Sequence, residues 1–130
     1  MKLNTLTAAS LISIVLLPAH VIGDVVRGFD PGGPGHLIVV GFMLLLACGT
    51  LLLSERRSGH AIMLLGGLAA LGMPLVHRNN GFTPAVAQAP GGPFFMWTLV
   101  ALGVTGGLAI LLSVRGLWSL RSRKRRSPPV

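Results

Sequence analysis

Long apolar runs separated by short polar segments dominate the pattern of the chain. A helix needs roughly 20 apolar residues to cross about 30 Å of hydrocarbon, and four runs reach or approach that length. They cover residues 6–26, 36–54, 60–76 and 94–113. Hydroxyl residues interrupt the first run, whereas the other three contain no Asp, Glu, Lys or Arg. The pattern predicts an all-α integral membrane protein folded as a four-helix transmembrane bundle.

Composition agrees with this class. Hydrophobic residues make up 52% of the 130 residues and charged residues only 11%, which is too apolar for a water-soluble domain of this length. We expect one four-span membrane domain over residues 1–120, followed by a basic cytoplasmic tail over residues 121–130.

Positive charges predict the orientation of the helices, because short cytoplasmic loops retain Lys and Arg. With the N-terminus inside, nine of the eleven Lys and Arg residues fall on the cytoplasmic side, and only Arg27 and Arg78 on the other. We therefore expect both termini in the cytoplasm, and the small size favours a bacterial inner membrane. The first run also resembles a cleaved signal peptide, with Lys2 before a short apolar stretch, and this alternative stays open.

Similar motifs precede the second and the fourth run. Pro-Gly-Gly-Pro occurs at residues 31–34 and again at 90–93, and each following run ends in Leu-Leu-Ser at the same offset. Two tandem helical hairpins, related by an axis along the membrane normal, would give this pattern. Coincidence in a chain rich in Gly, Leu and Pro is the alternative.

Small residues predict where the helices pack. Helices in lipid gain no hydrophobic energy on meeting, so they associate where small side chains let the backbones approach. The candidate packing positions in the third and fourth runs are Gly66, Gly67, Gly72, Gly103, Gly106 and Gly107.

The tail predicts contact with the membrane surface. Its closely spaced cationic residues are Arg121, Arg123, Lys124, Arg125 and Arg126. Because they follow directly on an apolar run, we expect them to bind anionic lipid headgroups and not nucleic acid.

Candidate ligands gather on the predicted non-cytoplasmic side. They are His20, Asp24, His36 and His77. Imidazole and carboxylate are ligands that copper, zinc and iron use, and His20 and Asp24 share one face of a helix because they are four apart. A metal site is one interpretation, and a haem held between His20 and His77 is another. The alternative is that no cofactor binds, the histidines are interfacial anchors, and Asp24 pairs with Arg27 or His20.

Several functional classes are disfavoured. Cys48 is the only cysteine, so the chain lacks the paired thiols of disulfide or quinone chemistry. A proton-coupled exporter needs a carboxylate within the membrane, and the interior of the apolar runs contains none. No G-x-S-x-G, HExxH or Walker motif occurs, and an enzyme is therefore disfavoured.

The remaining features favour a non-enzymatic accessory, assembly or scaffold subunit that contacts other membrane proteins or a second copy of itself. Small size and the glycine-rich packing surface motivate this expectation. The first alternative is a haem- or metal-binding membrane protein with its ligands at the extracytoplasmic face. The second alternative is a transporter of a neutral or lipid-like substrate, which needs no interior charge.

Overall fold

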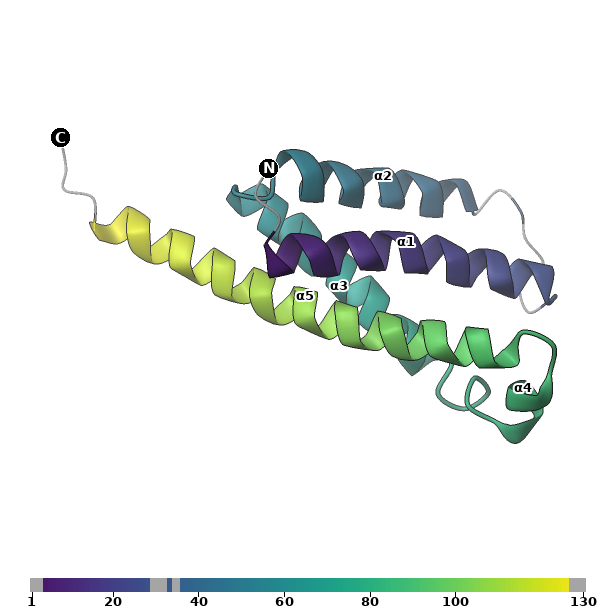
Figure 1. Cartoon of the computed structure of the whole chain (residues 1–130). Helices are drawn as coiled ribbons and strands as arrows, with labels where there is room; N and C mark the ends of the chain where they lie inside the picture. Colours follow the sequence, from purple (N-terminus) through teal and green to yellow (C-terminus); the bar gives the residue numbers. More distant parts are fainter. Residues whose placement is uncertain (1–3, 29–32, 34–35, 127–130) are drawn as a thin grey trace.

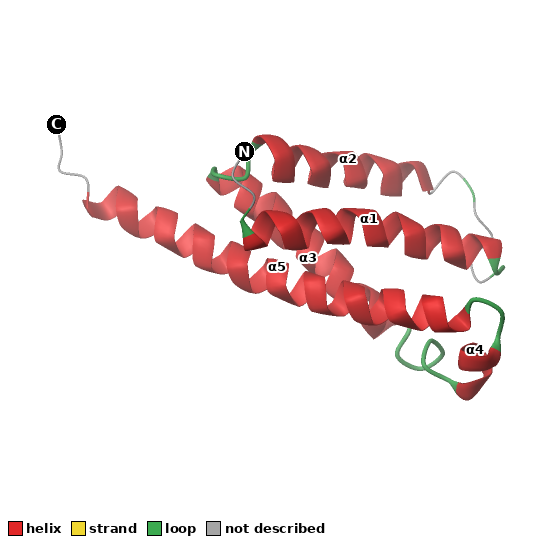
Figure 2. Cartoon of the chain, viewed as in Figure 1, coloured by secondary structure: helices red, strands yellow, loops and turns green. Residues whose placement is uncertain are grey.

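Helices connected by turns and loops make up the part of the protein that the structure, a computed structural model, describes (Figure 1). It describes residues 4–28, 33 and 36–126, giving only the backbone of His36 and of residues 123–126. Five helices follow one another: α1 (Thr5–Val26), α2 (His36–Leu52), α3 (Arg57–Val76), α4 (Pro84–Gln88) and α5 (Gly92–Arg126). Within those residues there is no strand (Figure 2).

Three of the helices are long and apolar enough to cross a membrane. They are α1, α3 and the stretch Gly92–Ser122 of α5. The predicted all-α membrane class is thus confirmed at this level. With 17 residues, α2 is shorter, and it rises about 25 Å against a hydrocarbon thickness of about 30 Å.

The helices differ from the prediction in the start of α3, at Arg57 and not at residue 60, in the length of the last helix and in one additional short helix. The last helix continues beyond residue 113 to Arg126, because the residues after the apolar run favour helix and contain no proline before Pro128. The short helix α4 was not predicted. It begins where the Thr83 hydroxyl accepts a hydrogen bond from the Val86 amide at 3.3 Å and where Pro84 occupies the first turn.

Glycines lie in the contact between α3 and α5, the most extensive contact between two of the described helices. A Cβ atom on Gly67 would lie 2.9 Å from the Gly106 carbonyl oxygen, and one on Gly106 would lie 2.6 Å from the Leu71 amide nitrogen. A Cβ atom on Gly66 would lie 2.7 Å from the Leu46 side chain, where α3 meets α2.

The other predicted packing glycines are less confined. A Cβ atom on Gly103 would meet the Pro74 side chain at 3.3 Å, whereas Gly72 and Gly107 face open space. Some of the six candidate glycines therefore lie in tight helix contacts and others do not. Their spacing along the chain does not show which are which.

Hydrogen bonds hold α1 against α5 in an antiparallel register. The Ser13 and Thr105 hydroxyl oxygens are 2.8 Å apart, and His20 Nδ1 lies 2.9 Å from the Thr98 hydroxyl oxygen. The residue numbers of both pairs have the same sum, as one antiparallel register requires. Between these two polar levels lies a buried apolar cluster of Leu16, Leu17, Ala70 and Leu102.

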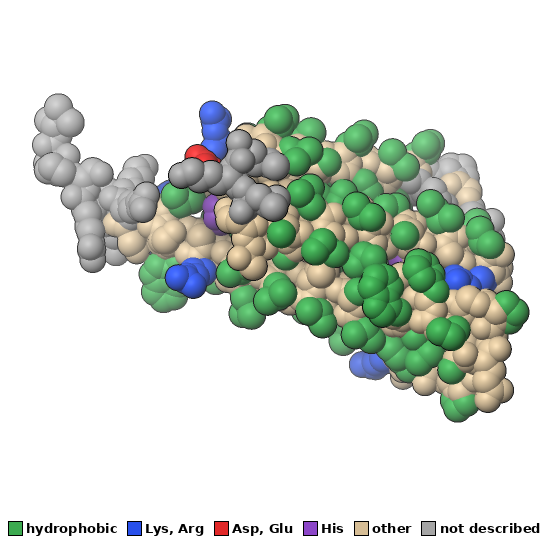
Figure 3. All heavy atoms as spheres, in the orientation of Figure 1, with side chains coloured by type: hydrophobic (Ala, Val, Ile, Leu, Met, Phe, Trp, Pro, Cys, Tyr) green, Lys and Arg blue, Asp and Glu red, His purple; other side chains and the backbone are tan. Residues whose placement is uncertain are grey.

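Apolar side chains also cover the exterior of the helices. Hydrophobic residues spread over most of the flank seen in Figure 3, and the Lys and Arg side chains in view lie at its margins. The C-terminal part of α5 projects beyond the other helices (Figure 1).

Of the two Pro-Gly-Gly-Pro motifs, only the second is fully described. Pro31, Gly32 and Pro34 of the first motif lie outside the described residues. In the second motif Gly91 has a φ of 73°, a left-handed conformation that glycine adopts without strain, and it turns the chain into α5.

Candidate metal site

Three candidate ligands meet at the end of the molecule where α1 and α3 finish and α5 begins. Asp24 Oδ2 lies 3.7 Å from His20 Nε2 and 3.5 Å from His77 Nε2. One ligand atom from each of the three residues falls within 4.8 Å of the other two. The chain thus places two imidazoles and one carboxylate around a common point.

Local helix geometry explains how the three residues reach that point. His20 and Asp24 are four residues apart on α1, so their side chains lie on one face. His77 is the residue that caps the C-terminus of α3, and its amide donates to the Met73 carbonyl at 3.2 Å. The end of α3 thus holds the third ligand beside α1.

Hydrogen bonds determine which nitrogen of His20 carries the proton in the neutral ring. The Thr98 hydroxyl donates to the Phe95 carbonyl at 2.7 Å, so its oxygen is free to accept from His20 Nδ1 at 2.9 Å. Nδ1 then carries the hydrogen, and Nε2 presents a lone pair toward Asp24.

His77 has the same tautomer for a simpler reason. Its Nδ1 lies 3.0 Å from the Met73 carbonyl oxygen, which can only accept a hydrogen bond. In their neutral forms both imidazoles therefore direct an unprotonated Nε2 at the carboxylate. Backbone or side-chain support of the remote ring nitrogen is the usual arrangement of metal-binding histidines.

The central atoms lack direct hydrogen bonds. Separations of 3.5 and 3.7 Å are longer than a direct N–H···O bond, and within the described residues neither His20 Nε2 nor Asp24 Oδ1 has a hydrogen-bond partner. Ligands held at about 2.1 Å around a tetrahedral ion lie about 3.4 Å from one another. The observed spacing resembles that of ligands around a shared cation.

An aromatic ring closes one side of the cluster. Phe95 stacks on the His20 ring with centroids 4.9 Å apart, and it meets the His77 ring edge-on at 5.5 Å. The side chain of His20 is fully buried, while those of Asp24 and His77 are 13% and 24% exposed. Among the described residues, Asp24 and His77 thus form the exposed side of the cluster.

A cation flanks the aromatic ring. The Arg27 guanidinium lies 5.8 Å from the centre of the Phe95 ring and donates to the Gly91 carbonyl at 2.9 Å. This hydrogen bond ties the end of α1 to the turn that precedes α5.

The remaining predicted site residues lie elsewhere or are not described. The side chain of His36 lies outside the described residues, so its place relative to the cluster stays a prediction. Arg121 is exposed on the projecting part of α5, and the side chains of residues 123–126 are not described.

Two residues of the cluster were missed by sequence analysis. Neither Phe95 nor Thr98 was predicted as part of the cluster. The sequence offered one signal, because Thr98 is a hydroxyl residue in an apolar run at about the depth predicted for the histidines.

These features define the class as a helical protein with three candidate membrane spans and a two-histidine, one-carboxylate cluster at one end. No protein-family model, curated protein or solved structure matches the chain.

Proposed function

We propose that this protein binds one transition-metal ion through His20, Asp24 and His77. The observation that carries the proposal is the convergence of two Nε2 atoms on one carboxylate oxygen, at 3.7 Å for His20 and 3.5 Å for His77, with both remote ring nitrogens hydrogen-bonded. Three electron-rich atoms that face one another without a donor between them favour a cation at their centre.

The ligand set indicates the chemical class of the ion. Imidazole nitrogen with carboxylate oxygen suits zinc, copper(II) and iron(II), whereas calcium and magnesium prefer oxygen alone. Three protein ligands leave a position for water or another small ligand. The partly exposed side of His77 provides the access that such a ligand needs.

A single ion fits this geometry better than haem. The ring centroids of His20 and His77 are only 5.2 Å apart and the rings are perpendicular. Axial histidines face each other through the iron from opposite sides of a flat macrocycle. Here Phe95 stacks against His20, in space that a macrocycle would need.

A network of ion pairs is the competing interpretation. If one histidine is protonated at Nε2, its positive charge also stabilises the Asp24 carboxylate, and the cluster then holds α1 against α3 without a metal. The two interpretations differ in a measurable way, because only the first predicts saturable binding of a divalent ion.

The proposed topology places this cluster on the extracytoplasmic side of a bacterial inner membrane. In this topology four helices, including α2, span the membrane as two hairpins. Both termini and the cationic tail lie at the cytoplasmic face. The distribution of Lys and Arg supports this orientation. A phosphatase reporter fused after residue 130 is expected to stay inactive, and one inserted in the loop before α4 to be active. The reverse pattern would overturn this orientation.

A role as an accessory or scaffold subunit is compatible with a metal site, because an ion that joins α1 to α3 would also stiffen the surface offered to a partner. We also propose that the polybasic tail binds anionic lipid headgroups. Transport of a neutral or lipid-like substrate stays a prediction that no contact described above favours.

Metal analysis of the purified protein tests the proposed function. Protein in mild detergent is stripped with a chelator, dialysed and titrated separately with Zn²⁺, Cu²⁺ and Fe²⁺ under conditions that keep iron reduced. We expect one ion per chain with a dissociation constant in the micromolar range or below. Failure to bind any of the three ions above detergent blanks would refute the proposal.

Thr98→Val tests the hydrogen bond that supports His20. The valine side chain keeps the volume of threonine but cannot accept from His20 Nδ1, so the ring loses the contact that fixes its tautomer. We expect the affinity for the ion to fall by about 10–100-fold.

Thr105→Val is the matched control. Thr105 lies on the same helix as Thr98, but its hydroxyl contacts Ser13 and not a residue of the cluster. The Thr105→Val variant should bind the metal ion with the same dissociation constant as the unaltered protein. Equal affinities for both variants would show that Thr98 does not position the ligand.

A further inference from the structure

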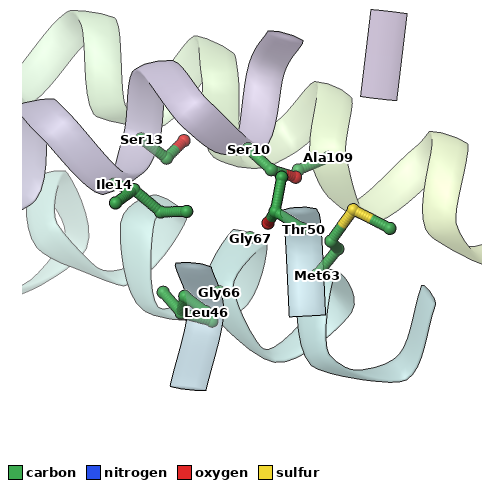
Figure 4. A pocket seen from close by; sticks show the side chains of 9 residues that line it. All are labelled: Ser10, Ser13, Ile14, Leu46, Thr50, Met63, Gly66, Gly67 and Ala109. Carbon is green, nitrogen blue, oxygen red and sulfur yellow. The ribbon is translucent and has the colours of Figure 1, made fainter. Parts of the chain in front are cut away.

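A small cavity with a mostly apolar wall lies between the helices, away from the histidine cluster. A cavity is lined by residues of α1, α2, α3 and α5, and its polar lining comes from the hydroxyls of Ser10, Ser13 and Thr50 (Figure 4). Gly66 and Gly67 of α3 contribute to its wall. The volume open to the centre of a water molecule is about 10 Å³, which is close to the space that one water requires.

Two of the three hydroxyls are buried without a partner. Ser10 is 6% exposed and Thr50 is 1% exposed, and within the described residues neither side-chain oxygen has a hydrogen-bond partner. Burying a hydroxyl in apolar surroundings destabilises the folded protein unless the hydroxyl forms a hydrogen bond. The cavity therefore combines a suitable space with two unused donors.

The third hydroxyl supplies an acceptor. Thr105 donates its hydrogen to the Ala101 carbonyl at 2.9 Å, so its oxygen can accept from the Ser13 hydroxyl at 2.8 Å. The Ser13 hydroxyl also lies 3.0 Å from the Ala9 carbonyl oxygen, so Thr105 or Ala9 engages its single hydrogen, while its oxygen keeps lone pairs for a donor in the cavity. A water molecule there can accept from Ser10 and Thr50 and donate to Ser13.

We infer that this cavity binds one water molecule, which bridges α1 and α2 through Ser10, Ser13 and Thr50. Buried waters typically make about three hydrogen bonds to polar groups that lack other partners. Among the described residues no direct side-chain hydrogen bond joins α2 to another helix. The water thus supplies a polar link to the helix that otherwise packs through apolar contacts alone.

Substitutions at the two unpaired hydroxyls give results of opposite sign for a hydrated and a dry cavity. If water is bound, Thr50→Val and Ser10→Ala each remove one of its partners, and each should lower the apparent Tm in detergent by about 3–6 °C. The double variant should lose little more than the larger single loss, because both residues hold the same water. A rise in Tm for Thr50→Val, or fully additive losses, would overturn the inference.

Ser113→Ala is the matched control for Ser10→Ala. The Ser113 hydroxyl is also buried and without a partner among the described residues, but it does not line the cavity. Its removal should leave the Tm unchanged or raise it. Equal losses at both serines would contradict a specific water site.

A measurement on the unaltered protein gives an independent answer. Solution NMR in micelles should show nuclear Overhauser transfer from a long-lived water to the Thr50 methyl group. Absence of this transfer, with the methyl resonance itself observed, would indicate a dry cavity and refute the inference.

Discussion

His77→Ala is expected to weaken binding of the transition-metal ion by at least about 100-fold. Removing a metal ligand costs more affinity than removing a hydrogen bond that orients a ligand, and the latter already costs about 10–100-fold. Removal of the imidazole leaves only His20 and Asp24, two ligands on a single helix, and the ion no longer joins α1 to α3. Isothermal titration of the chelator-stripped protein with Zn²⁺ measures the change directly.

Two further variants make this result specific. Asp24→Asn keeps the shape of the side chain but removes its charge, and we expect a loss of similar size. His60→Ala should bind the ion normally, because His60 lies on the first turn of α3, where its Nδ1 bonds to the Arg56 carbonyl at 3.0 Å. If His77→Ala bound the ion as tightly as His60→Ala does, the assignment of the ligands would be wrong.

Gly106→Ala is expected to lower the apparent Tm by about 5–15 °C, the range for overpacking of a tight contact. The new methyl group would lie 2.6 Å from the Leu71 amide nitrogen and 2.7 Å from the Gly67 carbonyl oxygen. These are backbone atoms that cannot move aside, so α3 and α5 must separate. Thermal unfolding in detergent, followed by circular dichroism, measures the loss.

The next residue provides the control. No heavy atom lies within 4 Å of a Cβ atom placed on Gly107, so Gly107→Ala adds a methyl group in open space. Alanine also favours helix over glycine, and the Tm should stay the same or rise slightly. Equal destabilisation by both substitutions would show that the contact between α3 and α5 is looser than described.

Apolar run lengths predicted the helices but not all of their ends. Hydropathy identifies the residues that prefer lipid, and it changes near residue 113, where arginines begin to appear. Helix formation follows backbone preferences that charged side chains do not oppose, so α5 continues to Arg126. The five-residue α4 depends on its cap and its proline, and a search for long apolar runs passes over such an element.

The candidate cluster was predictable in part. The spacing of His20 and Asp24 places both on one face of a helix, and His77 was a candidate ligand because it falls on the same predicted side of the membrane. Thr98 and Phe95 could not be identified, because their proximity depends on the register of α1 against α5. That register is set by packing between segments far apart in the chain, and a single sequence does not record it.

The unbroken length of α5 has a mechanical consequence. One helix carries Phe95 and Thr98 beside the histidine cluster and Arg121 on the projecting end, with no proline between residues 94 and 126. A continuous helix transmits rotation about its axis with little loss, because twisting would strain its hydrogen bonds. Any rotation of α5 at the cluster would therefore turn Arg121 through the same angle at the opposite end of the helix.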